Sequence, residues 1–497
     1  MGPIATTTLG AVRGLERGDH LAFLGIPYAQ PPVGSLRFAA PEPLDAWTGR
    51  RDAIEFGDAA PQDPFVPASF RATVPESEDC LSLNVYTPAV DGERRPVLFW
   101  VHGGGFSHGS GSQAAYDGGP LAERGDVVVV TINYRVGALG YLYLGSHGGD
   151  AWGAAANAGQ LDQIAALRWV RDNIERFGGD PDNVTVFGQS AGGVAVSTLL
   201  AMPAANVLFH KAIAQSGTAN RLGDTTFASA VTSQYLDRLG LADADPVRLR
   251  TMGISELLRA QGPRGPLSPV VDGDSLPQLP LHAVGDGRAA HIAVMVGTAR
   301  DEQKLYVAPD RAEIDDAELG RQVLECLPRR SADRVGEVIA LYRESRNARG
   351  LPATNNDISD AIATASRFRF PATQLAEAQA LHRRTFVYQV DWESPARRGA
   401  LGACHAIEIP FVFGTVGKTG NDRMSGTGPD ADRLAEQMMD AWIAFARSGE
   451  PGHDGIGEWP AYDTTDRQTM IFGRRCGAQR APFEEERAVW ESMITRR

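Results

Sequence analysis

The chain has 497 residues, of which 43% are hydrophobic, 22% charged and 8% aromatic, and its formal net charge is −13. This composition is that of a globular protein, and the acidic balance argues against binding to nucleic acid or to anionic membrane surfaces. The sequence has no run of 18 or more apolar residues, so we expect no segment that spans a membrane.

The four cysteines, Cys80, Cys326, Cys404 and Cys476, are widely separated along the chain. Their spacing matches neither a CxxC pair nor a set of metal ligands, so we expect no metal and no dependence on disulfides. The N-terminal residues do not combine a basic region with an apolar one, as a secretion signal does. These features predict a cytoplasmic protein.

Six short runs rich in β-branched residues mark the framework of the chain. None alternates regularly between apolar and polar residues, which predicts strands that are buried on both faces and hence a largely parallel sheet. The runs are residues 96–102, 126–133, 184–188, 211–215, 292–297 and 385–391.

A helical pattern lies between the second and third of these runs. Over residues 157–177, apolar side chains recur every three or four positions, and glycines and a proline follow. The order strand, helix, strand indicates an α/β protein with helices flanking a central sheet. We expect a single domain over residues 1–497, with helical insertions near 220–290 and 305–380 that form the walls of a pocket.

The sequence Gly-Gln-Ser-Ala-Gly at 188–192 directly follows one predicted strand and precedes an apolar helical run. In this setting, a sharp turn between strand and helix exposes the hydroxyl of Ser190 at the positive end of the helix dipole. The pattern alone is weak evidence, because a structural turn with an inert serine has the same residues. Its position between strand and helix predicts that Ser190 is a nucleophile.

A second glycine-rich segment, His-Gly-Gly-Gly-Phe at 102–106, follows another predicted strand. Acyl transfer builds negative charge on a carbonyl oxygen, and fixed backbone N–H groups stabilise that charge. Consecutive glycines permit the close backbone path that such a site needs. By itself this segment indicates a flexible turn, but together with Ser190 it predicts an oxyanion hole.

A serine nucleophile needs a histidine base and a carboxylate that orients the base. In the α/β-hydrolase fold, to which both motifs point, the acid follows the serine and the histidine follows the acid. After the fifth predicted strand, spacing alone favours Asp301 and Glu302 about equally. Among the later histidines, His382 lies in a charged helical stretch and His453 in a polar loop, so the pattern favours His405.

Taken together, the motifs resemble those of the type-B carboxylesterase family, which includes cholinesterases and bacterial p-nitrobenzyl-type esterases. The resemblance covers nearly the whole chain, from FLGIPYAQPPVGSLRFAAPEP at 23–43 through SEDCLSLNVYTP at 77–88 to CHAIEIPFVFG at 404–414. So many motifs in the same order make the resemblance specific. It implies an α/β-hydrolase fold with serine esterase activity.

The resemblance also implies roles for individual residues. Ser190 is expected to be the nucleophile, Glu302 the acid and His405 the base. The expected oxyanion donors are the N–H groups of Gly104, Gly105 and Ala191. Structural ion pairs Arg37–Glu78 and Arg135–Asp162 are implied, with Ser216 as a support for the site.

Three departures from the family pattern bear on function. Gln189 stands where the family has glutamate before the nucleophile, and this loss of negative charge argues against a cationic substrate. Gln303 replaces the glycine that commonly follows the acid. Ala60 stands where relatives place the disulfide partner of Cys80, so we expect Cys80 to be a free, buried thiol.

These observations predict a serine hydrolase without a cofactor that cleaves small to medium apolar or aromatic carboxyl esters through an acyl-serine intermediate. Its expected partner is a small-molecule ester, and the sequence predicts no particular oligomeric state. Phe65, Phe70 and Phe106 are candidate walls of the pocket. Two alternatives stay open: a catalytically silent binding protein on the same fold, and hydrolysis of carbamates or amides by the same residues.

Overall fold

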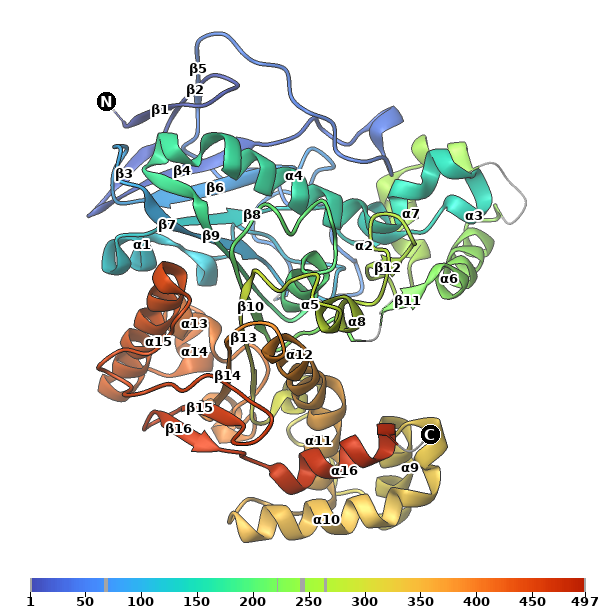
Figure 1. The fold of residues 1–497 in the computed structure, drawn as a ribbon. Coiled ribbons are helices and arrows are strands. Elements are labelled where there is room, and N and C mark those ends of the chain that lie inside the picture. Colours follow the sequence, from blue (N-terminus) through green and yellow to red (C-terminus); the bar gives the residue numbers. More distant parts are fainter. Residues whose placement is uncertain (1, 67–69, 221, 242–245, 263–265, 496–497) are drawn as a thin grey trace.

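The computed structural model describes residues 2–66, 70–220, 222–241, 246–262 and 266–495. A large mixed sheet crosses the molecule, and helices cover both of its faces (Figure 1). Its eleven strands pair in the order β16 (Gly477–Arg480), β15 (Gln468–Phe472), β14 (Thr385–Val390), β13 (Ala293–Ala299), β10 (Lys211–Gln215), β9 (Gly179–Gln189), β7 (Arg95–Val101), β8 (Val128–Ile132), β6 (Ser82–Thr87), β4 (His20–Pro27) and β3 (Leu15–Arg17).

Two smaller sheets lie outside this one. The first pairs β1 (Ile4–Thr6), β2 (Ala11–Arg13) and β5 (Arg50–Asp52), and the second pairs β11 (Gly223–Asp224) with β12 (Val270–Val271).

The central part of the large sheet is parallel, as predicted. Strand β7 runs parallel to β8 and β9, and the parallel pairing continues through β10, β13, β14 and β15. All six predicted strands are present, and every residue of β7 is buried. The sequence did not predict the antiparallel strands β6, β4 and β3 on one side of the sheet or the strands β15 and β16 on the other. Gly25 and Pro27 interrupt the apolar pattern of β4, and its pairing with β6 shifts register between Phe23 and Ile26.

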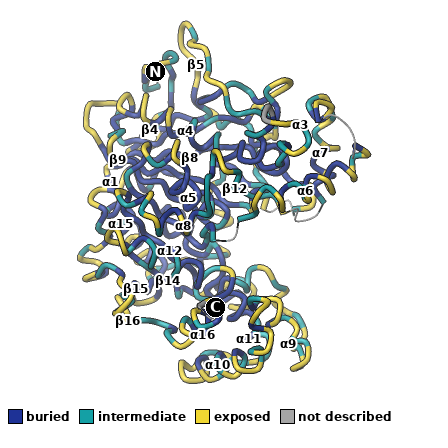
Figure 2. Tube along the Cα trace, turned by 45° about the vertical axis from the view of Figure 1, so that its right-hand side comes forward, coloured by how far each residue is buried: buried dark blue, intermediate teal, exposed yellow. Residues whose placement is uncertain are grey.

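Alternate side chains of each strand point to opposite faces of the sheet, so the core has two halves. Val97 and Phe99 pack on the face covered by α4 (Ala158–Asn173), α5 (Ala191–Leu199) and α12 (Phe370–Ala380). Leu98 and Trp100 pack on the opposite face, under α1 (Gly119–Gly125), α13 (Ile409–Val412) and α15 (Pro429–Ser448). Figure 2 shows this buried centre between exposed outer loops and helix faces. The predicted helix at 157–177 corresponds to α4 and a 3-10 turn that follows it.

Both predicted insertions contain helices. The first contains α6 (Thr225–Arg238), α7 (Ile254–Ala260) and α8 (Pro280–Gly285). The second contains α9 (Asp316–Cys326), α10 (Val335–Ala348), α11 (Asn355–Thr364) and α12. Helices α9, α10 and α11 gather with α16 (Glu484–Thr495) at one end of the molecule, around a separate core that includes Tyr342 and Trp490 (Figure 1).

The remaining helices, α2 (Gly137–Tyr141), α3 (Gly145–Gly148) and α14 (Asn421–Ser425), are short. Within the described ranges, no helix combines the length and the apolar character needed to cross a lipid bilayer.

Candidate active site

The serine that follows β9 has a strained backbone. Ser190 has φ 59° and ψ −124°, and it lies between Gln189, the last residue of β9, and Ala191, the first residue of α5. Positive φ is uncommon for a residue with a side chain, and such strain is concentrated at functional sites. The Ser190 N–H donates to the carbonyl of Gln215 at 2.8 Å, which holds the turn against β10. Its side chain is partly exposed at the carboxyl end of the parallel strands.

Glycines surround this turn because no side chain fits there. A Cβ at Gly192 would overlap the carbonyl oxygen of Val101, the last residue of β7. A Cβ at Gly217 would overlap the carbonyl oxygen of Ser190 itself. The turn is therefore fixed by contacts between backbone atoms.

Glu302 and His405 form a buried pair near this turn. The Oε2 atom of Glu302 lies 2.5 Å from Nδ1 of His405, and Glu302 is 0% exposed. The second carboxylate oxygen of Glu302 accepts a hydrogen bond from the N–H of Ala299, the last residue of β13, at 2.7 Å. Both carboxylate oxygens of Glu302 therefore have hydrogen-bond partners, and one of these partners is the imidazole of His405. A carboxylate at Nδ1 places the ring proton there and leaves Nε2 as the acceptor.

The other candidates from the sequence have different partners. Asp301 accepts a hydrogen bond from the N–H of Ala403 at 3.1 Å and does not contact the imidazole of His405. His382 and His453 each bond a backbone carbonyl, those of Gly285 and Gln437. Of the two acidic residues that spacing left open, Glu302 is the one whose side chain contacts the imidazole of His405.

Ser190 and His405 have other partners in this structure. Nε2 of His405 lies 3.1 Å from the side-chain nitrogen of Gln189, which donates to it. The side chain of Ser190 lies close enough to the phenol of Tyr306 to lower its pKa, against the larger effect of burial, which raises that pKa. Across the described part of the chain, no hydrogen bond joins Ser190 to His405 directly. Transfer of a proton from Ser190 to Nε2 of His405 requires the contact between Gln189 and His405 to open.

The glycine-rich segment after β7 provides unpaired donors beside Ser190. Gly104 has φ +116° and Gly105 has φ +59°, and a Cβ at Gly103 would lie 2.7 Å from the carbonyl oxygen of Gln189. Among the described residues, no acceptor pairs with the N–H of Gly104 or of Gly105. Free backbone donors on a strained loop next to a nucleophile are what an oxyanion site needs.

His102, the first residue of this segment, is packed in the interior of the protein. It is buried, and burial lowers its pKa to about 4. Its ring stacks on that of Tyr134 with centroids 4.3 Å apart, and the hydroxyl of Tyr134 donates to the His102 carbonyl. The imidazole is therefore neutral and packed into the core.

Aromatic rings cover His405 on its outer side. The ring of Phe368 lies 5.1 Å from the imidazole and that of Tyr306 lies 5.3 Å from it, measured between centroids. Both residues come from the second insertion. Sequence reasoning did not identify either of them, because an aromatic residue in a helical insertion carries no local signal of its position in space.

Glu408 is a buried carboxyl group that sequence reasoning also missed. Burial, together with the charge of Glu302, raises its pKa to about 7. One of its oxygens accepts from the side chain of Gln215 at 3.3 Å, and the other has no partner among the described residues. The hydroxyl of Ser216 is likewise unpaired within the described chain. The only sequence signal for Glu408 is its position three residues after His405.

Known proteins resemble this chain from end to end. The carboxylesterase family profile matches residues 1–490. The para-nitrobenzyl esterase of Bacillus subtilis (strain 168) is 38% identical, with 97% of each chain aligned. The phenmedipham hydrolase of Pseudarthrobacter oxydans is 35% identical, with 95% of each chain aligned.

This chain belongs to the carboxylesterase family. A solved PNB esterase structure shares its fold with a TM-score of 0.87 at 36% identity, and the match covers 99% of each chain. The α/β-hydrolase fold expected from the sequence is therefore confirmed. The protein is a carboxylesterase of the serine hydrolase class.

Two ion pairs expected in this carboxylesterase are present. Arg37 binds both oxygens of Glu78 at 2.6 Å. Arg135 binds both oxygens of Asp162 at 2.8 and 2.7 Å, and both side chains are buried. Cys80 is a free, buried thiol as predicted, and burial raises its pKa.

The structure also describes the surroundings of other residues that the sequence singled out. Phe106 is buried, whereas Phe65 and Phe70 are 50% and 51% exposed. Gln303 donates from its backbone to Thr364 and accepts at its side chain from Arg367, so it ties the segment after the acid to α11 and the turn that follows. In the described residues, no group of three or more His, Cys, Asp or Glu side chains could hold a metal ion.

Proposed function

We propose that this carboxylesterase cleaves small to medium apolar or aromatic carboxyl esters with Ser190 as nucleophile, His405 as base and Glu302 as the acid that orients the base. The buried Glu302–His405 contact of 2.5 Å supports this assignment most strongly. It directs the free ring nitrogen of His405 toward the turn that carries Ser190, since that nitrogen contacts the neighbouring Gln189.

The proposed reaction has two steps. His405 takes the proton of Ser190 through Nε2 as the serine oxygen attacks the ester carbonyl, and the alcohol leaves with a proton returned by His405. Water activated by His405 then hydrolyses the acyl-serine. Glu302 holds the imidazole tautomer and stabilises the transient imidazolium. In both steps the oxyanion binds the N–H groups of Gly104, Gly105 and Ala191.

The proposed substrate class follows from the surroundings of His405. Phe368 and Tyr306 offer aromatic faces beside the imidazole. Gln189 contributes no charge where a glutamate would, so a cationic substrate has no carboxylate partner at this position. The relative from B. subtilis is named for para-nitrobenzyl esters, and we propose aromatic esters of similar size as substrates here.

We further propose a cytoplasmic location, in keeping with the four free cysteines.

Substitution of the nucleophile tests this proposal directly. Ser190→Ala should abolish hydrolysis of p-nitrophenyl butyrate, whereas Ser233→Ala, at an exposed position on α6, should leave the rate unchanged. An organophosphate should label the wild-type peptide that contains Ser190, as detected by mass spectrometry. Activity retained by Ser190→Ala, or a wild-type chain that is neither active nor labelled, would overturn the proposal.

A matched set of substrates separates the remaining alternatives. An ester, a carbamate and an anilide that share the same acyl and leaving-group skeleton are compared by kcat/KM. We expect the ester to be hydrolysed fastest, because its leaving group is better and its acyl-serine is released faster than the carbamoyl form. A higher kcat/KM for the carbamate would replace the proposed ester preference.

A further inference from the structure

Asp301 joins the loop that carries Glu302 to the loop that carries His405. Its N–H donates to the carbonyl of Ala403 at 2.9 Å, and its Oδ2 accepts from the N–H of Ala403 at 3.1 Å. Ala403 lies two residues before His405, and Asp301 directly precedes Glu302. A reciprocal pair of hydrogen bonds therefore connects two loops that are distant in sequence, immediately beside the Glu302–His405 contact.

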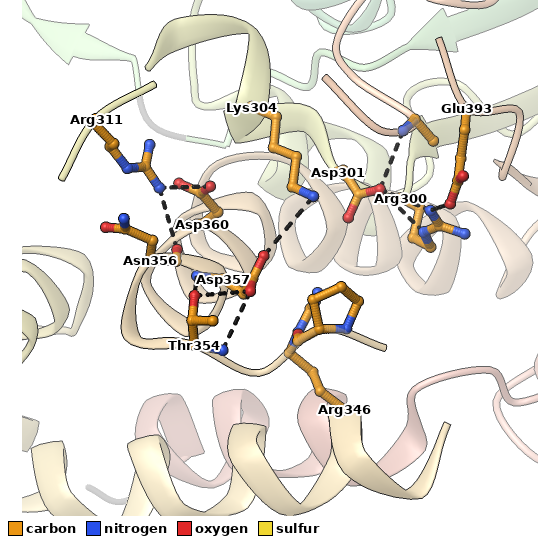
Figure 3. A network of polar contacts seen from close by, with 12 residues as sticks. Arg300, Asp301, Lys304, Arg311, Arg346, Thr354, Asn356, Asp357, Asp360 and Glu393 are labelled. Carbon is orange, nitrogen blue, oxygen red and sulfur yellow. Dashed lines mark hydrogen bonds and ion pairs between the residues drawn. The ribbon is translucent and has the colours of Figure 1, made fainter. Parts of the chain in front are cut away.

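The carboxylate of Asp301 is itself held in place. Arg300 donates to Oδ2 from Nε at 3.1 Å and from a terminal nitrogen at 2.9 Å, and it also binds Glu393 at 2.6 Å (Figure 3). Burial raises the pKa of Asp301, but the charges of Arg300 and Lys304 and the Ala403 N–H outweigh it and hold the pKa below its usual value. The carboxyl group of Asp301 is therefore ionised at neutral pH, and both of its oxygens can accept hydrogen bonds.

Gly402 leaves room for this carboxylate. It has φ +54°, and a Cβ built on it would lie 2.7 Å from Oδ2 of Asp301. Gly399, three residues earlier in the same loop, also has positive φ (+85°), but nothing lies within 4 Å of its Cβ position. The close approach at Gly402 is thus a specific feature of the contact with Asp301.

We propose that Asp301 is a positioning residue for ester hydrolysis: by clamping the acid loop to the histidine loop through Ala403, it sets the distance and direction between Glu302 and His405. This inference rests on the proposed roles of those two residues. Asp301 contacts neither Ser190 nor the ring of His405 and acts through the backbone. A displacement of about 1 Å between reacting groups is enough to cost about a hundredfold in rate, so a loose clamp has a large effect.

Three substitutions separate positioning from charge. Asp301→Ala removes the acceptor and should lower kcat by roughly 10- to 100-fold while KM changes less than about twofold. Asp301→Asn keeps an oxygen for the Ala403 N–H and should restore kcat to within about fivefold of wild type. Glu393→Gln removes the other partner of Arg300. The side chain of Glu393 is 64% exposed and has no hydrogen bond to Ala403 among the described contacts, so kcat should stay unchanged.

The pH profile of kcat/KM gives a second readout. The titratable groups that face His405 are Glu302, Glu408, Tyr306 and Cys404, and of these Glu302 alone shares a hydrogen bond with its ring. A carboxylate at Nδ1 stabilises the imidazolium, and a loosened contact weakens this stabilisation. In the pH profile of kcat/KM, the acid limb is the range in which the value falls toward acid pH. For Asp301→Ala, this limb should therefore move to lower pH. A substitution that only destabilised the fold would lower the amplitude without moving this limb.

Two glycine substitutions test the same clamp without altering Asp301. Gly402→Ala should repeat the loss of kcat and the shift of the acid limb, because its Cβ displaces the carboxylate from Ala403. Gly399→Ala carries a similar backbone strain but meets no neighbour, and it should keep kcat within about twofold. The double variant Asp301→Ala/Gly402→Ala should be no slower than Asp301→Ala, since both changes break one contact.

The outcomes separate this inference from the proposed function. If wild type hydrolyses p-nitrophenyl butyrate and Ser190 is labelled, but Asp301→Ala keeps wild-type kcat and acid limb, the positioning role is wrong and the proposed function stands. Full additivity of the two changes in the double variant would also overturn it. If wild type is inactive and unlabelled, the proposed function itself fails. Titration of active sites with an organophosphate ensures that kcat is calculated per folded enzyme.

Discussion

The two regions that hold the proposed nucleophile and the proposed base are stabilised in different ways. At the turn after β9, Ser190 is fixed by backbone sterics, because carbonyl groups of β7 and of the turn itself occupy the places where side chains at Gly192 and Gly217 would extend. The loop that carries His405 is instead held by polar side chains, through Asp301, Arg300 and Glu302. The first arrangement is encoded by adjacent residues, and the second depends on residues about a hundred positions apart.

This difference predicts how each region responds to substitution. A substitution at the turn should disturb folding and activity together, because the backbone there cannot move to make room for an added side chain. A change in the polar contacts of the histidine loop should disturb activity more than folding, because a loop can shift while the sheet beneath it stays intact.

The largest effect is expected at the acid. Glu302→Gln removes the charge that stabilises the imidazolium and presents an amide that favours the wrong tautomer of His405, so kcat should fall by about 10³- to 10⁴-fold. Steady-state hydrolysis of p-nitrophenyl butyrate measures this, with Glu325→Gln, exposed on α9, as the control. A loss below about tenfold would contradict the assignment of Glu302 and return Asp301 to consideration.

At the turn, Gly192→Ala should lower stability and activity together. The added methyl group would overlap the Val101 carbonyl, and overpacking of this kind costs about 1–3 kcal/mol or more in the free energy of unfolding. Thermal unfolding and esterase activity are measured on the same preparation. Gly320→Ala, in helix α9 with open space around its Cβ position, should leave both unchanged or raise stability slightly. An active Gly192→Ala enzyme with wild-type stability would show that the turn is not sterically fixed.

The contact between Gln189 and His405 predicts a shift in pH dependence. Gln189→Glu places a carboxylate next to Nε2 of His405, and this negative charge stabilises the imidazolium. Because the base must be neutral, the acid limb of kcat/KM should move to higher pH, and activity should be lost over a wider acidic range. Gln234→Glu adds the same charge at an exposed position on α6 and should leave the limb in place. A limb unchanged in Gln189→Glu would mean that this side chain leaves His405 during catalysis.

The smallest effect is expected at Tyr306. Tyr306→Phe keeps the ring beside His405 and Phe368 but removes the phenol hydroxyl next to Ser190. Without the phenol beside it, the Ser190 hydroxyl is free to approach His405, so kcat/KM should rise about two- to fivefold, the effect of about one neutral hydrogen bond. The rate is measured with p-nitrophenyl butyrate, and Tyr143→Phe, away from His405, is the control. A decrease would show instead that the phenol assists the transition state.

Local patterns in the sequence determined much of this protein. Buried strands such as β7 appear as continuous apolar runs, and the strained turn at Ser190 needs particular residues next to one another, so both could be predicted. The predicted ion pairs and the free thiol of Cys80 came from the resemblance to the family and are present.

Tertiary structure alone decided how the distant parts of the site meet. Spacing could not separate Asp301 from Glu302, because adjacent side chains point in different directions and only the fold shows that one reaches the imidazole and the other the backbone of Ala403. Tyr306, Phe368 and Glu408 likewise gained their positions from packing around His405. A strained turn requires particular residues at neighbouring positions, so a sequence pattern can indicate it. A contact between loops depends on distances in the folded structure, which a single sequence does not show.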